Sequence, residues 1–162
     1  CAMSAASNLA EIERFLYHEA SFLDRPDLDA WIQLYTEDGT YWMPASEDQP
    51  DPLNHISHFY DDRVLMEIRR RNFVHPRASS KDSDVRCSHI ISNIRQEELT
   101  EKGDLLVRSN FQVVMFYRNE QRVYAGTYEH HLKAFDSSFL IRHKRVNLIN
   151  PSAAHKSLII YL

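Results

Sequence analysis

The sequence predicts an α+β fold, with three N-terminal helices packed on one face of a curved antiparallel sheet. Two observations support this prediction. Apolar residues recur at helical spacing in much of residues 8–72, whereas residues 85–149 contain four consecutive segments with the apolar and polar alternation of strands. The connections between these four segments are short, so successive strands are expected to pair antiparallel as a meander. Helices that precede such a sheet typically cover one of its faces.

Three segments have the apolar spacing of helices. The first begins at Asn8, a favourable N-cap residue. The second runs from Leu28 to Tyr35 and the third from Asp61 to Asn72. Between the last two we expect a short aromatic strand at residues 40–43 and an acidic, proline-containing surface loop at residues 45–54. A polar connection, residues 75–84, then leads into the sheet.

The four strands of the meander are predicted at residues 85–98, 105–118, 122–135 and 139–149. The second is the clearest, because most of its odd positions are apolar, whereas the polar residues Arg108, Asn110 and Gln112 fall between them. A single antiparallel sheet with one buried face follows from this pattern.

Length and composition favour one domain over residues 1–162, with residues 1–7 disordered or derived from a tag. The apolar segment 157–162 is expected to pack either on the chain's own sheet or on a neighbouring subunit. A net charge of -4 argues against nucleic-acid binding. Two distant cysteines and the lack of an apolar run of roughly 18 residues favour a cytoplasmic protein that binds no membrane.

Two patterns could suggest a metal site. His55 and His58 with Asp61 or Asp62 resemble a two-histidine, one-carboxylate set if this stretch is helical, but such spacing is frequent by chance. The segment Cys87-Ser88-His89 has half of the spacing of a Rieske site, and the second half is missing. We therefore expect neither a metal nor a cofactor in this chain.

The interior of the curved sheet is the place where an enzymatic site could form. Inward-facing His89, Tyr128 and His130 could act as acid and base on a small ligand. The alternative is a buried histidine hydrogen-bonded to a tyrosine or a backbone carbonyl, because the sequence places no carboxylate clearly beside the imidazole. The chain also lacks a G-x-S-x-G elbow and a glycine-rich phosphate loop. No catalytic residue is therefore predicted from motifs.

Several sequence blocks occur together in a fixed order. They are residues 15–20, 23–24, 31, 34–35, 38–44, 60–62, 65, 69–71 and 87–94. These blocks resemble the small (beta) subunits of aromatic-ring-hydroxylating, Rieske non-haem iron dioxygenases, and are most similar to the benzoate and anthranilate branch. Residues 74–82 depart from the tryptophan-containing pattern of other members.

The resemblance implies a cone-shaped fold, cystatin-like and similar to scytalone dehydratase. It also implies a hetero-hexamer of three large (alpha) and three small subunits that acts in aromatic hydrocarbon catabolism. The Rieske iron-sulfur cluster and the mononuclear iron would lie in the large subunit, which receives electrons from NADH through a reductase. The small subunits would form a trimer with a structural role.

Aromatic residues and arginine are enriched at subunit interfaces. The interface candidates are Trp31, Tyr41, Trp42, Arg69, Arg70 and Arg71. A core position for Trp31 and a solvated helix end for the arginines are the alternatives. Two further functions stay open: a stand-alone cone-fold dehydratase or isomerase, and a small-ligand-binding protein.

Overall fold

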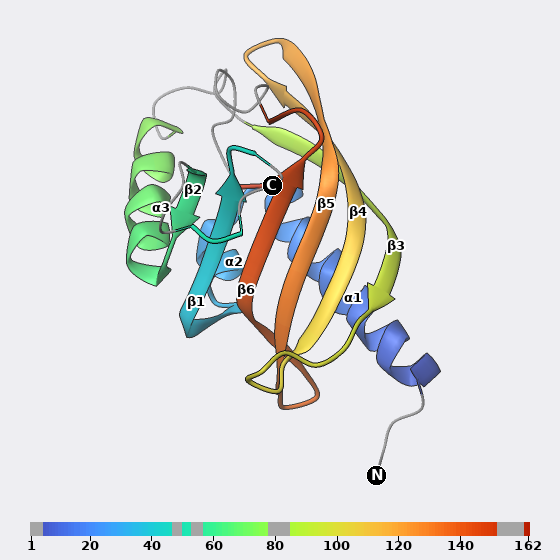
Figure 1. The fold of residues 1–162 in the computed structure, drawn as a ribbon. Coiled ribbons are helices and arrows are strands. Elements are labelled where there is room, and N and C mark those ends of the chain that lie inside the picture. Colours follow the sequence, from blue (N-terminus) through green and yellow to red (C-terminus); the bar gives the residue numbers. More distant parts are fainter. Residues whose placement is uncertain (1–4, 47–49, 53–56, 78–84, 152–160) are drawn as a thin grey trace.

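The computed structural model describes residues 5–46, 50–52, 57–77, 85–151 and 161–162. In this part of the chain, the strands form one sheet and the helices lie beside it (Figure 1). The sheet order is β2-β1-β6-β5-β4-β3, and only the β1–β6 pair is parallel. The elements are α1 (Ala5–Asp24), α2 (Leu28–Ile32), β1 (Tyr35–Pro44), β2 (Ser57–Asp61), α3 (Arg63–Arg77), β3 (Arg86–Gln96), β4 (Leu105–Tyr117), β5 (Glu120–Phe135) and β6 (Ser138–Leu148).

Helix α1 crosses one face of the sheet and buries one side against it (Figure 1). It begins at Ala5, three residues before the predicted cap at Asn8. Residues 1–4 of the segment expected to be disordered or tag-derived lie outside the described residues. Ile12, Leu16 and Leu23 are fully buried at helical spacing, as predicted.

The prediction extends the second helix too far at its C-terminal end. α2 ends at Ile32, and Tyr35 already belongs to β1, which is longer than the predicted strand at residues 40–43. The cause is pairing with β6: the Ile141 N–H donates to the Leu34 carbonyl at 2.7 Å, and Tyr35 lies beside Ile141 in the sheet. A distant strand therefore overrides the local helical spacing.

The segment around residues 57–77 also differs from the prediction. Residues 57–61 form strand β2 against β1, and α3 begins only at Arg63. Asp62 caps this helix by accepting from the Leu65 N–H at 2.9 Å. The helix continues to Arg77, beyond the predicted end at Asn72, and residues 78–84 lie outside the described residues. α3 contacts α2, β1 and β2 at this edge of the sheet.

Strands β3 to β6 form the predicted antiparallel meander. The β4–β5 hairpin turns through two residues only, Arg118 and Asn119, both with positive φ (51° and 62°). This backbone matches the twist of a two-residue hairpin, so β5 begins at Glu120, two residues earlier than expected.

The core lies between the sheet and the helices α1 and α2, and large aromatic side chains fill much of it. Trp31 stacks on Tyr161 with ring centroids 4.4 Å apart, and Phe111 stacks on Tyr128 at 4.1 Å. Tyr161 and Leu162 are buried on their own chain, whereas residues 157–160 of the apolar C-terminal segment lie outside the described residues.

Candidate functional site

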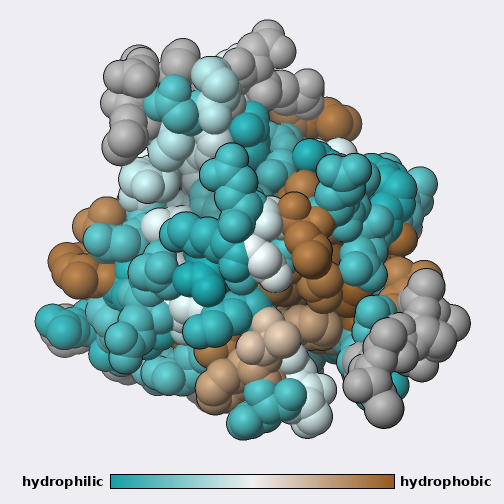
Figure 2. Space-filling view, turned by 60° about the horizontal axis from the view of Figure 1, so that its bottom comes forward, coloured by the Kyte–Doolittle hydropathy of each residue, from teal (hydrophilic) through white to brown (hydrophobic). Residues whose placement is uncertain are grey.

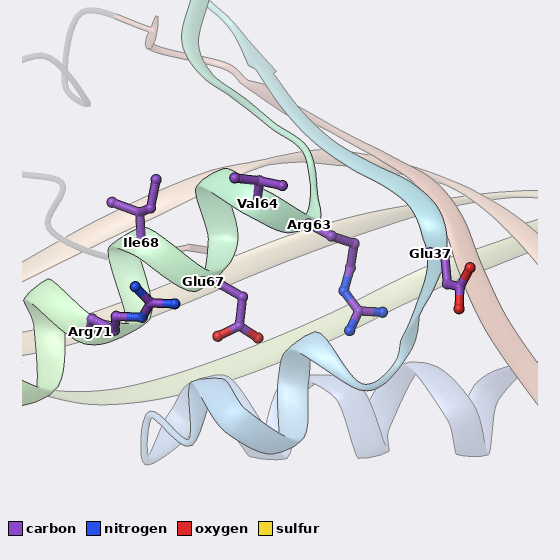
Figure 3. A pocket seen from close by; sticks show the side chains of 6 residues that line it. All are labelled: Glu37, Arg63, Val64, Glu67, Ile68 and Arg71. Carbon is purple, nitrogen blue, oxygen red and sulfur yellow. The ribbon is translucent and has the colours of Figure 1, made fainter.

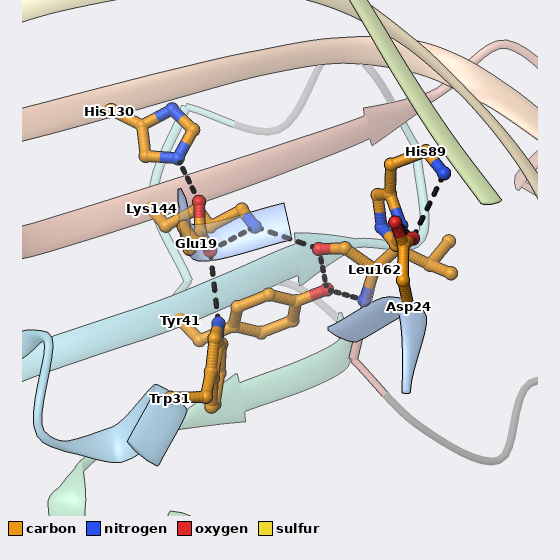
Figure 4. A network of polar contacts seen from close by, with 8 residues as sticks. All are labelled: Glu19, Asp24, Trp31, Tyr41, His89, His130, Lys144 and Leu162. Atoms are coloured by element: carbon orange, nitrogen blue, oxygen red, sulfur yellow. Dashed lines mark hydrogen bonds and ion pairs between the residues drawn. The ribbon is translucent and has the colours of Figure 1, made fainter. Parts of the chain in front are cut away.

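A buried cluster around Glu19 unites four elements inside the cone (Figure 4). Glu19 of α1 accepts from His130 Nε2 of β5 at 2.9 Å through Oε1. Its Oε2 accepts from Lys144 Nζ of β6 at 2.6 Å and from Trp31 Nε1 of α2 at 3.0 Å. One carboxylate therefore receives three hydrogen bonds, two of them from residues more than 100 positions away in sequence.

Burial and the charges inside the cluster together set its protonation states. The side chains of Glu19, His130 and Lys144 are 2%, 0% and 1% exposed. Burial by itself raises the pKa of Glu19, but the charges of Lys144 and His130 and their hydrogen bonds lower it well below its ordinary value. Burial lowers the pKa of His130, and Glu19 offsets this only in part. The cluster is thus an ionised carboxylate with a neutral imidazole that donates from Nε2.

Lys144 links the cluster to Leu162. Its pKa is lowered by burial, which Glu19 partly offsets. Lys144 Nζ donates to the Leu162 carbonyl at 2.9 Å and lies 4.4 Å from the centre of the Tyr128 ring. The Leu162 N–H donates to the Tyr41 hydroxyl at 3.0 Å. The ammonium group therefore has partners on both sides although it is removed from solvent.

The three predicted cone residues do face inward, but they do not converge on one site. His89 pairs with Asp24 at the end of α1, with Nδ1 and Oδ1 2.5 Å apart, whereas His130 pairs with Glu19. The Tyr128 hydroxyl has no hydrogen-bond partner among the described residues. The expectation that no carboxylate orients these imidazoles was wrong, because both carboxylates come from α1.

Glu19 and Lys144 were absent from the sequence-predicted site, although a signal for each exists. Glu19 lies on the apolar stripe of α1, three residues after Leu16, and Lys144 shares the alternation of Val146 and Leu148 in β6. A charged residue on an apolar face requires a buried partner of opposite charge. The sequence contained this requirement but not the identity of the partners.

The aromatic interface candidates fill the interior of this chain. Trp31 and Tyr41 are fully buried, and Trp42 is nearly so. Trp42 Nε1 donates to Ser57 Oγ at 2.8 Å, and the Arg145 guanidinium covers its ring at 4.4 Å. The core alternative for Trp31 therefore agrees with its position, and an interface role for these residues stays a prediction.

The arginine candidates lie on α3 at the surface. Arg69 forms an ion pair with Asp61, and Arg70 pairs with Glu67 at 2.9 Å. Arg71 lines an open pocket of about 510 Å³ together with other residues of α3 and one of β1 (Figure 3). The lining residues are Glu37, Arg63, Val64, Glu67, Ile68 and Arg71. Unlike the Glu19 cluster, this pocket is lined by no histidine, and no nucleophile is present in it.

Within the described residues, no group of three or more His, Cys, Asp or Glu side chains is arranged to hold a metal ion. His58 lies on a strand rather than on the helix that the two-histidine set required, and its Nε2 is 2.8 Å from the Pro151 carbonyl. His55 lies outside the described residues. None of the described helices is long and apolar enough to span a bilayer.

Comparison with known proteins extends these observations. A family model described as "Ring hydroxylating beta subunit" matches residues 18–153. Benzoate 1,2-dioxygenase subunit beta of Acinetobacter baylyi is 35% identical over 118 residues, which cover 69% of each chain. The crystal structure of the beta subunit of benzoate 1,2-dioxygenase from Burkholderia mallei is 28% identical, with a TM-score of 0.78 over 93% of this chain and 95% of that one.

The fold is shared more widely. The structure of a putative scytalone dehydratase from Novosphingobium aromaticivorans superimposes with a TM-score of 0.64 at 16% identity, over 88% of this chain and 85% of that one. This similarity concerns the fold alone. Together with the six-stranded sheet, it confirms the predicted cone-shaped α+β fold.

Proposed function

This chain belongs to the ring-hydroxylating dioxygenase beta subunit family, as its resemblance predicted, and we propose that it supports assembly of a catalytic large subunit without catalysing a reaction itself. The function as a small subunit of such a dioxygenase follows from the family. The division of labour between the two subunits is the proposal.

The observation that carries this proposal is the state of the Glu19 cluster. An acid or base that acts on a substrate has to reach it within hydrogen-bond distance. Glu19, His130 and Lys144 are instead almost fully buried, and both oxygens of the carboxylate are engaged by protein donors. Stacked aromatic rings such as Phe111 and Tyr128 occupy the space beside them. These features support a role for the cluster in holding α1, α2, β5 and β6 together.

The proposed partner is the large (alpha) subunit, in a cytoplasmic hetero-hexamer of three large and three small chains. The Rieske cluster, the mononuclear iron and the electrons from NADH would enter through that subunit and its reductase. Both similar beta subunits are named for benzoate dioxygenases, so an aromatic carboxylate is the proposed class of substrate.

The arginine candidates and the outer face of α3 are the proposed contact surface. Val64 is 67% exposed and Ile68 is 44% exposed, and Arg71 lies beside them. Exposed apolar side chains mark candidate interaction surfaces, and arginine is enriched at interfaces. Figure 2 shows that several separate apolar patches lie between hydrophilic residues on one face of the molecule.

Co-expression with the large subunit of the same host tests the proposal. The purified complex, supplied with NADH and the reductase, is expected to convert benzoate to a dihydroxylated product and to contain iron. The small subunit alone is expected to produce nothing from benzoate or from dehydratase and isomerase substrates. Activity of the isolated chain that disappears in His130→Ala would instead establish the cone-enzyme alternative, and benzoate binding without turnover the ligand-binding one.

A matched pair of surface variants tests the contact surface. Arg71→Glu is expected to reduce the amount of large subunit that co-purifies, because it reverses a charge within the proposed interface. Arg122→Glu, near the start of β5, is expected to leave the amount of co-purified large subunit unchanged. Equal recovery of the large subunit with both variants would remove α3 from the interface.

A further inference from the structure

Five buried side-chain polar atoms have no hydrogen-bond partner among the described residues, and three of them lie together on the paired strands β4 and β5. These three are Ser109 Oγ, Tyr128 OH and His130 Nδ1. All three side chains are at least 98% buried. Ser109 of β4 lies directly opposite Tyr128 of β5, and His130 is the next inward-facing residue of β5. The three residues therefore occupy adjacent positions on one face of two paired strands.

The chemistry of these atoms is complementary. The His130 imidazole donates to Glu19 through Nε2, so its Nδ1 carries a lone pair and can only accept. The hydroxyls of Ser109 and Tyr128 can each donate and accept. Burial and, secondly, the charge of Glu19 raise the pKa of Tyr128, which keeps its hydroxyl protonated. One acceptor and two neutral donor-acceptor groups thus lie on the same buried face of the β4–β5 pair.

Buried polar groups in folded proteins are almost always hydrogen-bonded, either to protein or to an internal water molecule. We propose that Ser109 Oγ, Tyr128 OH and His130 Nδ1 form a binding site for internal water, which extends the Glu19 network to β4. A site for water needs two to four polar partners, and these residues supply three.

Other occupants fit the surroundings less well. An anion would lie close to the Glu19 carboxylate, which is only one imidazole ring away. An organic molecule would have to displace the stacked rings of Phe111 and Tyr128, whose centroids are 4.1 Å apart. Water satisfies the polar atoms without disturbing this packing.

The sign of a stability change tests the proposal. Tyr128→Phe keeps the ring, its stacking on Phe111 and its contact with Lys144, but deletes the hydroxyl. If water is bound, this variant loses a hydrogen bond, and the ratio of folded to unfolded protein falls by about fivefold or more. If the hydroxyl is unpaired, its removal raises the ratio. Tyr17→Phe, at an exposed position of α1, is the control and is expected to change nothing.

Two further measurements locate the water itself. A crystal structure of the chain at high resolution is expected to show solvent density within hydrogen-bond distance of at least two of the three atoms. The ¹⁵N chemical shift of His130 Nδ1 is expected to be that of a nitrogen that accepts a hydrogen bond. This shift is expected to change in the Ser109→Ala variant. An increase in stability of Tyr128→Phe, direct bonds among the three side chains, or density for a larger molecule would each overturn the proposal.

Discussion

Replacing Lys144 by methionine tests the structural importance of the buried cluster most directly. The variant keeps the length of the side chain but removes the ammonium group that lies 2.6 Å from Glu19 Oε2 and 2.9 Å from the Leu162 carbonyl. Glu19 then remains as a buried carboxylate without its cation. Removing one partner of a buried ion pair costs roughly 3–5 kcal/mol of unfolding free energy, because the other charge is left uncompensated.

A double-mutant cycle separates this coupling from the loss of packing. Glu19→Gln removes the charge and retains an oxygen that can accept from His130. The double variant Glu19→Gln/Lys144→Met contains no uncompensated charge, so its loss of stability is expected to be smaller than the sum of the single losses. A difference of roughly 0.5–3 kcal/mol is typical of directly coupled residues.

Urea denaturation followed by circular dichroism at pH 7 measures these free energies. The control is Arg122→Met, which breaks the exposed pair of Arg122 with Glu120, whose side chains are 48% and 65% exposed. An exposed pair contributes at most about 1 kcal/mol. The reasoning is refuted if Lys144→Met costs no more than this control.

The ionisation of Glu19 in the same cluster makes the free energy of unfolding depend on pH. The pKa of Glu19 in the folded state is below its ordinary value of 4.5. Its stabilising contribution is therefore fully present above that value and is lost as pH falls further, through the pKa of the folded state. The difference in stability between the wild type and Lys144→Met is expected to shrink in acid.

Three further predictions concern other parts of the molecule. Gly126→Ala is expected to lower the free energy of unfolding, measured by urea denaturation, by at least about 3 kcal/mol, because a Cβ there would lie 1.8 Å from the Asn147 carbonyl oxygen. Gly103→Ala should cost about 1 kcal/mol, because Gly103 has a φ of +82° but open space around it. Burial, and secondly His131, lower the pKa of His143 from 6.5 to about 4. The free energy of unfolding should therefore fall by roughly 2–3 kcal/mol between pH 6.5 and pH 4, because the unfolded chain binds the proton more readily. The His143→Gln variant should show a flatter dependence on pH. Burial, and secondly Asp24, raise the pKa of the Cys87 thiol from 9.0 to about 12, so its alkylation at pH 8, followed by peptide mass spectrometry, should be about 1000-fold slower in the folded protein than in urea.

Sequence alone determined the elements whose signals are local. The alternation in β4 predicted its buried face, because successive side chains of a strand point to opposite sides whatever the strand pairs with. The short connections predicted the meander, since strands joined by only a few residues pair antiparallel. The amphipathic stripe predicted α1, and the ordered blocks predicted the family and thereby the cone.

Tertiary structure decided everything that depends on distant pairing. β1 lies in parallel beside β6, a contact that converts Tyr35 from the predicted helix to a strand. Glu19 meets Lys144 across 125 positions of sequence, so no local pattern could identify the two as partners. Sequence shows that a charged residue lies on an apolar face, but the chain has to fold before the group that neutralises it is determined, because a buried charge is paired through space and not along the chain.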